Sequence, residues 1–165
     1  TAVEVDGMTA KITGDLTLRS EVTNELATAS RKMRTGFDAL VRTRGLTLAR
    51  ARALMLLARH PGISQTELAG LLEIENPTVV RLLDGLEKQG LISRTPAADD
   101  RRVKRIDLTE AAEDQVDEIE DLAEVMRGTM ARGIPEADLT VTLNVLRRMI
   151  ANLESGPAAD DGEAD

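Results

Sequence analysis

Residues 63–109 constrain the fold of this chain more than any other stretch does. Ser64 and Glu67 have the spacing of a helix-capping box, in which a hydroxyl and a carboxylate each satisfy a backbone amide at the start of a helix. Pro77 has no N–H to donate and is tolerated only in the first turn of a helix, so a second helix must begin beside it. The spacing therefore predicts two short helices joined by a tight turn, the second over residues 76–89.

The residues after the second helix predict a hairpin. Residues 91–94 and 103–108 alternate apolar and polar side chains, as half-buried strands do, and Ile63 is expected to add one short strand. The segment between the two longer strands is rich in Pro, Ala and Asp, which is typical of an open loop. Helix, turn, helix and a small wing together predict a winged helix-turn-helix lobe over residues 46–109.

Helical segments flank this lobe. Residues 15–45 carry apolar side chains at spacings of three and four, and residues 110–153 show two further helical patterns, the first capped by a threonine at 109. Residues 1–14 have no sustained period and residues 154–165 are acidic, so both are expected to be disordered. The predicted fold is mainly α with a small β-wing.

The net charge of −8 is unevenly distributed. Residues 47–107 contain ten Lys and Arg against eight Asp and Glu, a balance of +2, whereas the remainder holds 11 basic and 21 acidic residues, or −10. Phosphate binds to a local basic patch, so the overall acidity does not exclude nucleic acid. Phe37 is the one aromatic residue, which excludes base stacking on aromatic side chains as single-strand binders use it.

The helix-turn-helix pattern indicates how this chain reads DNA. The second helix of such a motif enters the major groove, where Arg81 can pair with guanine and Thr78 can touch a thymine methyl group. The loop arginines suit a narrow minor groove. Either feature alone is explained as well by a solvated surface charge, but their order and spacing together favour DNA. The residues expected at the interface are Ser64, Gln65, Thr66, Asn76, Pro77, Thr78, Val80, Arg81, Arg94, Asp100, Arg101, Arg102 and Lys104.

From residue 46 to about residue 131 the sequence resembles the MarR-type winged-helix regulators, and most closely their SlyA-like branch. The matching runs are IENPTVVRLLD at 74–84, LEKQGLISR at 86–94 and, most specifically, DRRVKRIDLT at 100–109. The resemblance implies a homodimeric transcription factor on a pseudo-palindromic operator, with its recognition helix at 76–89 and its wing at 94–104. It also implies that Asp100 orients Arg102 for the minor groove.

One residue departs from the family pattern. Many members have glycine in the turn of the helix-turn-helix where this chain has Glu73. If this backbone is left-handed, glutamate costs roughly 1 kcal/mol there.

The apolar stripes outside the lobe find too little partner surface in one chain. They either pack on each other within one chain or, as the resemblance favours, intertwine with a second chain in a two-fold dimer. The residues expected at this dimer contact are Leu18, Val22, Leu26, Leu139, Leu143, Leu146, Ile150 and Leu153.

The family commonly binds small aromatic anions between its dimer helices and its DNA-binding lobes. Met33, Phe37, Met55 and Met126 are the candidates to line such an effector pocket here. A methionine-rich stripe is more often plain core, which is the favoured interpretation of these four residues.

Two other classes of function compete with DNA binding. The first is a winged-helix module that no longer reads DNA and binds a protein through its acidic helices; arginines on both the second helix and the wing argue against it. The second is an enzyme, for which the sequence has no catalytic set or phosphate loop. With no cysteine and one histidine, neither a metal site nor a cofactor is expected. No apolar run approaches the roughly 18 residues of a membrane span, so we expect a cytoplasmic protein without a membrane partner.

Overall fold

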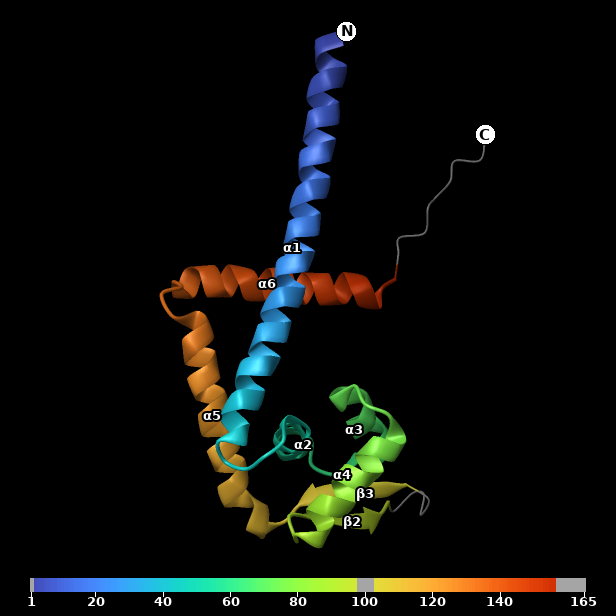
Figure 1. Cartoon of the computed structure of the whole chain (residues 1–165). Helices are drawn as coiled ribbons and strands as arrows, with labels where there is room; N and C mark the ends of the chain where they lie inside the picture. The colour runs from blue at the N-terminus through green and yellow to red at the C-terminus, as the bar shows by residue number, and fades with distance from the viewer. Residues whose placement is uncertain (1, 98–102, 157–165) are drawn as a thin grey trace, which may run out of the picture. The chain divides into compact units, whose positions relative to one another are not determined.

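The computed structural model describes residues 2–97 and 103–156, with side chains from residue 16 onward. The chain divides into two compact units, residues 1–126 and residues 127–165. In chain order the elements are α1 (Ala2–Arg42), α2 (Leu48–Arg59), β1 (Ile63–Ser64), α3 (Gln65–Leu72), α4 (Asn76–Lys88), β2 (Ile92–Pro96), β3 (Lys104–Leu108), a 3-10 turn (Glu110–Ala112), α5 (Glu113–Ala131) and α6 (Glu136–Glu154) (Figure 1). This order confirms the predicted mainly α fold with a small β-wing. In the described part of the chain, no helix is both long enough and apolar enough to span a membrane.

Three short antiparallel strands form the wing sheet, in the order β1-β3-β2. Ile106 of the central strand pairs with Ile63 on one side and with Arg94 on the other. The short strand predicted at Ile63 is confirmed as β1, which ends at Ser64, the residue before α3. The wing is therefore joined directly to the start of the first helix of the helix-turn-helix.

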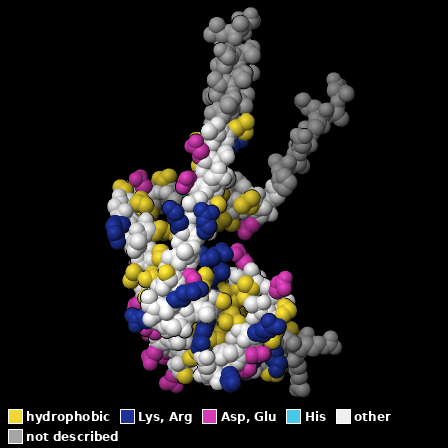
Figure 2. All heavy atoms as spheres, viewed as in Figure 1, with side chains coloured by type: hydrophobic (Ala, Val, Ile, Leu, Met, Phe, Trp, Pro, Cys, Tyr) yellow, Lys and Arg dark blue, Asp and Glu magenta, His cyan; other side chains and the backbone are white. Residues whose placement is uncertain are grey.

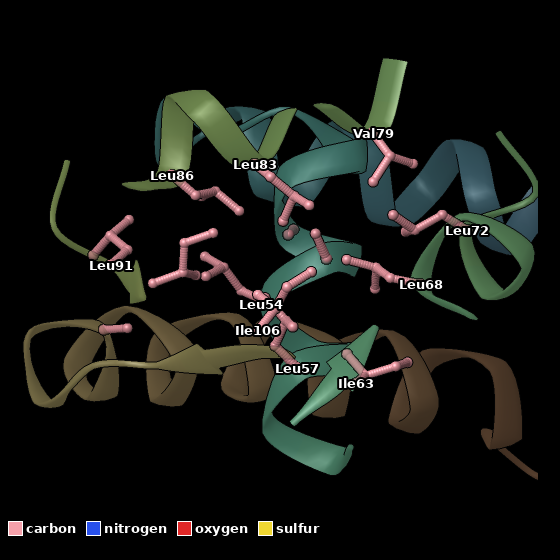
Figure 3. Close-up of a cluster of buried hydrophobic side chains, with 14 of the residues drawn as sticks. Leu54, Leu57, Ile63, Leu68, Leu72, Val79, Leu83, Leu86, Leu91 and Ile106 are labelled. Atoms are coloured by element: carbon pink, nitrogen blue, oxygen red, sulfur yellow. The ribbon is translucent and has the colours of Figure 1, made fainter. Parts of the chain in front are cut away.

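Aliphatic side chains from α2, α3, α4 and β3 form the core of the first unit, and Figure 3 shows them converging. The largest fully buried side chains are Val41, Leu54, Leu57, Leu68, Leu72, Val79, Leu83, Leu86, Ile106 and Ile119. Each buried leucine contributes about 1.5–3 kcal/mol. Among the described residues no polar or charged residue is buried, so apolar packing alone holds the centre of this unit.

The amphipathic pattern of α4 decides which of its faces is buried. Val79, Leu83 and Leu86 are buried and point into the core cluster (Figure 3). Pro77 lies in the first turn of the helix, as predicted. Gly90 follows the helix with φ of 73°, a left-handed conformation that glycine adopts without strain and that ends the helix. The opposite face of α4 is consequently left in solvent.

The turn between α3 and α4 contains the strained residue of this unit. Glu73 has φ of 56° and ψ of 41°, which is the left-handed conformation considered for it from the sequence. Two arginines from other helices hold this turn. The Arg52 guanidinium donates to the carbonyl oxygens of Leu71 and Leu72, each at 3.3 Å, and Arg34 lies 3.5 Å from the Glu73 carboxylate. Contacts from α1 and α2 thus stabilise a turn in which Glu73 adopts a left-handed conformation that glutamate disfavours.

The backbone of α1 begins earlier than the sequence predicts. Residues 1–14 are expected to form a disordered leader, but the described backbone is helical from Ala2. Neither Gly7 nor Gly14 is a strong breaker, since each costs only about 1 kcal/mol relative to alanine in a helix. A helix nucleated by the strongly periodic segment after residue 15 can therefore extend through both glycines.

Thr109 was predicted to cap the helix that follows it, but its side chain makes a different hydrogen bond. Thr109 holds the N-cap position, but its hydroxyl donates to the carbonyl oxygen of Gly90 at 2.6 Å and does not cap the helix. The first turn is a 3-10 turn, and α5 begins only at Glu113. The prediction was wrong because the carbonyl exposed after α4 competes for the same hydroxyl.

Acidic residues of α5 pair with an arginine of the turn after α1 and with an arginine of α2. Arg44 lies 2.7 Å from Glu118, and Arg59 lies 3.0 Å from Glu120. All four side chains are at least about a third exposed, so each pair contributes at most about 1 kcal/mol. Part of the acidity of the chain therefore serves to hold the first part of α5 against α2 and the turn after α1.

In the second unit, α6 contains no buried residue. Leu143, Ile150 and Leu153 are 46%, 56% and 82% exposed, although apolar side chains of this size favour burial. The helix predicted for this region is confirmed, with Glu154 as its last residue. The acidic tail is expected to be disordered, but its residues from 157 on lie outside those that the structure describes.

The strain at the helix-turn-helix turn can be measured with a matched pair of variants. Glu73→Gly and Glu73→Ala both remove the carboxylate that contacts Arg34, but only glycine adopts this φ freely. We expect the glycine variant to be more stable than the alanine variant by about 1 kcal/mol, as measured by urea denaturation. Equal free energies of unfolding would show that the left-handed backbone carries no strain.

Candidate nucleic-acid interface

The solvent face of α4 carries the residues predicted to meet base edges. Asn76, Pro77, Thr78 and Arg81 are exposed and Val80 is half-buried. In the part of the chain that the structure describes, Arg81 makes no ion pair and so presents its five donors to solvent. The N-terminal half of this helix is therefore accessible from solvent.

A groove at the start of α3 gathers the residues predicted to meet phosphate. Ser64, Gln65, Thr66 and Glu67 at the start of α3 line it together with Val103, Lys104 and Arg105 of the wing, and its volume is about 580 Å³. The amide groups at the start of a helix carry partial positive charge, and an adjacent lysine adds a full one. The basic side chains and the helix start suit an anion, whereas the Glu67 carboxylate, which accepts from the Ser64 amide, opposes one.

A second groove connects the two helices of the motif. Thr66 of α3 lines it together with Asn76 and Pro77 of α4, and its volume is about 680 Å³. Glu73 and Glu75 also line this groove, so its charge is mixed. On the face of the molecule seen in Figure 2, basic and acidic side chains are likewise interspersed over the lobe.

The capping box at the start of α3 is present as predicted. The Glu67 amide donates to the Ser64 hydroxyl at 3.3 Å, and the Ser64 amide donates to the Glu67 carboxylate at 2.9 Å. The Arg105 guanidinium donates to the Gly62 carbonyl at 3.1 Å, just before this cap. Arg105 was not among the predicted site residues, although it belongs to the same basic run as Lys104; strand pairing brings it to the groove.

The structure gives Arg94 two protein partners. Its side chain is only 16% exposed, and its Nη2 donates to Asp84 at 2.5 Å and lies 3.2 Å from the Glu87 carboxylate. Both carboxylates belong to α4. Arg94 therefore differs from the predicted DNA-binding residues of α4, because its side chain is largely buried and paired with carboxylates.

Comparison with known proteins identifies the family. The MarR family model matches residues 46–104. The solved structure of the transcriptional regulator PA3341 is 43% identical, with 79% of this chain and 96% of that chain covered and a TM-score of 0.72. The chain belongs to the MarR family. Members of this family are transcriptional regulators and not enzymes.

Two further solved MarR-type structures are similar to this protein. MepR of S. aureus, solved in complex with DNA, is 26% identical over 78% of this chain and 96% of its own, with a TM-score of 0.66. SlyA is 24% identical over 81% and 94%, with a TM-score of 0.69, and shares the fold. The family predicted from the sequence is confirmed, and the likeness to SlyA is consistent with the predicted branch.

The tip of the wing lies outside the described residues. Asp100, Arg101 and Arg102 fall in the gap between residues 97 and 103. On the described side of the gap, the Ala97 amide donates to the Val103 carbonyl at 2.9 Å, which closes the hairpin beyond the paired strands. The roles of these three residues in the minor groove remain predictions.

The four candidate effector residues differ in their surroundings. Phe37 and Met55 pack against the core cluster, and a Cβ atom placed on Gly36 would lie 2.7 Å from the Met126 Cε, so Met126 packs on α1. Met33 is 38% exposed. The grooves described above are lined by other residues. Packing accounts for three of the four residues, and an effector pocket stays a prediction.

The residues predicted for dimerisation divide between the two units. On α1, Leu18, Val22 and Leu26 are 59%, 37% and 43% exposed. On α6, Leu143, Ile150 and Leu153 are exposed, whereas Leu139 and Leu146 are half-buried.

Among the described residues, no group of three His, Cys, Asp or Glu side chains could hold a metal ion.

The cap at the start of α3 makes a prediction about pH. Hydrogen bonds from the Ser64 side chain and then from its backbone lower the pKa of the Glu67 carboxyl, and the Arg105 charge acts in the same direction, against a smaller opposing effect of desolvation. The stabilisation by the ionised carboxylate is therefore complete above the ordinary pKa and is lost as the pH falls through the lowered one.

Ser64→Ala removes the largest cause of this shift. We expect the pKa of Glu67 to rise toward its ordinary value in the variant, as followed by NMR titration of the side-chain carboxyl carbon. The same titration midpoint in both proteins would contradict the capping box as the cause.

Proposed function

We propose that this MarR-family regulator binds double-stranded DNA as a homodimer and reads a pseudo-palindromic operator. The observation that carries the proposal is the exposed N-terminal half of α4, with Thr78 and Arg81 in solvent, together with a groove that contains the start of α3 and Lys104. MepR, a relative with the same fold, was solved with DNA.

Base reading is assigned to the solvent face of α4. An arginine that makes a bidentate contact with guanine O6 and N7 discriminates against other bases by about 1–3 kcal/mol. Arg81 suits this contact because it is exposed and leads from the helix face opposite the buried stripe. Thr78 lies close to it on the same face and suits a thymine methyl group.

Phosphate binding is assigned to the start of α3 and to the wing. Ser64, Gln65 and Thr66 share their groove with Lys104, so backbone amides and an ammonium group are proposed to meet the same phosphate. Arg101 and Arg102 at the wing tip are proposed to enter the minor groove. These contacts set the register of the protein on the duplex, whereas α4 reads the sequence.

The dimer follows from the uncovered apolar side chains. Leu18 on α1 and Ile150 on α6 are each more than half exposed in the single chain. We propose that a second copy covers both helices, with a two-fold axis that repeats the recognition helix. Two recognition helices about 34 Å apart would then face successive major grooves on one side of the duplex.

Control by a small aromatic anion is the finer part of the proposal. Met33 is the most accessible of the four candidate residues. Such a ligand would act by favouring a spacing of the recognition helices that does not match the operator.

Selection of bound fragments from random duplex DNA tests the proposal. Enrichment of a two-fold symmetric sequence, together with the dimer mass by light scattering at micromolar concentration, is the expected result. No enrichment would favour a winged-helix module that binds protein, and a monomer would overturn the dimer.

Arg81→Ala should relax specificity at one base pair in each half-site. We expect the operator to lose about 1–3 kcal/mol of discrimination at that position, because the guanine contact is lost there alone. Binding to operators changed at each position in turn measures it. Lys88→Ala removes the same charge from the exposed C-terminal end of the helix and should change no single base preference. Equal effects of the two variants would contradict base reading by Arg81.

A further inference from the structure

Arg94 joins the wing sheet to the recognition helix. Directly opposed residues of two antiparallel strands share one face of a sheet, so Arg94 lies on the same face as the fully buried Ile106. From this core-facing position its guanidinium reaches Asp84, at 2.5 Å, and Glu87, at 3.2 Å. It is a cation at a position where the strand alternation would place an apolar side chain.

We infer that Arg94 is a positioning residue, which sets the rotation of α4 about its own axis relative to the wing. The inference rests on the proposed function, because the rotation of α4 matters only if this helix reads DNA. It assigns Arg94 a role different from the direct DNA contact expected from the sequence.

The two carboxylates lie where they oppose rotation. At 100° per residue, Asp84 lies about 60° and Glu87 about 120° around the helix from Arg81, both on one flank. A rotation of α4 by about 20° would move its surface by about 2 Å, which is enough to break the hydrogen bond from the Arg94 Nη2 to Asp84 and its ion pair with Glu87. The guanidinium therefore restrains the angle on which base reading by Arg81 depends.

The core cannot impose this restraint as sharply. Val79, Leu83 and Leu86 hold α4 on the lobe through apolar contacts, and the hydrophobic effect has no preferred direction. Hydrogen bonds between a guanidinium and carboxylates do have a preferred direction, and they are stronger than neutral ones. The ion pair thus supplies an orientation that the leucine stripe leaves loosely defined.

A direct phosphate contact by Arg94 fits the structure less well. The side chain is 16% exposed, whereas those of Asp84 and Glu87 are 60% and 46% exposed. If the guanidinium turned to a phosphate, it would leave two unpaired carboxylates on the flank of the recognition helix. Both would then repel the DNA backbone.

The test compares carboxylate variants of α4 in the full chain. Asp84→Asn and Glu87→Gln each remove a negative charge, which by charge alone should strengthen binding to every duplex. Loss of the restraint should instead weaken binding to the selected operator by about five- to tenfold and leave binding to a scrambled duplex equal or tighter. Dissociation constants for both duplexes over a range of salt concentrations measure the two effects.

Glu75→Gln is the matched control. Glu75 is an exposed carboxylate at the N-cap of the same helix, and its side chain makes no capping hydrogen bond. Removal of this charge should tighten binding to operator and scrambled duplex alike, so that their ratio is unchanged. Identical behaviour of Asp84→Asn and Glu75→Gln would overturn the inference.

Arg94→Gln separates positioning from phosphate binding. If Arg94 positions α4, the ratio of operator affinity to scrambled-duplex affinity falls, and the dependence of affinity on salt concentration keeps its slope. Adding Asp84→Asn to Arg94→Gln then causes little further loss, because the two residues act through one contact. A phosphate contact would lower the salt slope by about one per subunit and weaken both duplexes equally; Lys104→Gln calibrates that response.

Three other results would overturn a claim. If Arg94→Gln lowers thermal stability while the folded variant keeps its affinity ratio, Arg94 is merely structural and the inference fails. If the operator affinity of Asp84→Asn and Glu87→Gln is not reduced, the inference also fails, even if Arg94→Gln does not fold. If wild-type protein prefers no duplex, the proposed function fails and the inference fails with it.

Discussion

The buried stripe of α4 is the constraint on which the rest of the lobe depends. Val79, Leu83 and Leu86 are held in a cluster with no buried polar residue among those described, and this leaves only one face of the helix for solvent. Thr78 and Arg81 lie on that face because of where the leucines are. The hydrophobic core therefore determines which side chains of α4 are available for the base contacts proposed above, although none of its own members is exposed.

The turn before α4 shows a second constraint, on backbone conformation. Glu73 must be left-handed for α3 and α4 to meet at this angle, and a residue with a Cβ resists that conformation. Arg52 binds the carbonyl groups at the end of α3, and Arg34 contacts the Glu73 carboxylate. The turn is thus supported by α1 and α2, so a change in α1 would reach the DNA-binding helices directly.

Features that depend on nearby residues could be predicted from the sequence. The capping box, the proline at the start of α4 and the periodic leucines are all local, and the elements of the lobe were found within a few residues of their predicted bounds. The start of α1 was not, since the helix begins at Ala2 and not near residue 15. The contacts of Arg94 and the hydroxyl of Thr109 could not be predicted, because they depend on how strands and helices pair in space. In the sequence, Arg94 and Arg81 are both arginines within the predicted DNA-binding lobe and look alike. The structure distinguishes them, because the Arg94 side chain is largely buried and contacts two carboxylates.

The order β1-β3-β2 makes β2 an edge strand of the wing. Because the Ala97 amide points inward to Val103, alternation turns the backbone nitrogen of Pro96 toward the open edge. Proline has no hydrogen there to donate, so this edge lacks a donor that a foreign strand would need. The wing can therefore meet a large, charged polymer through its side chains while resisting sheet-to-sheet aggregation with other wings.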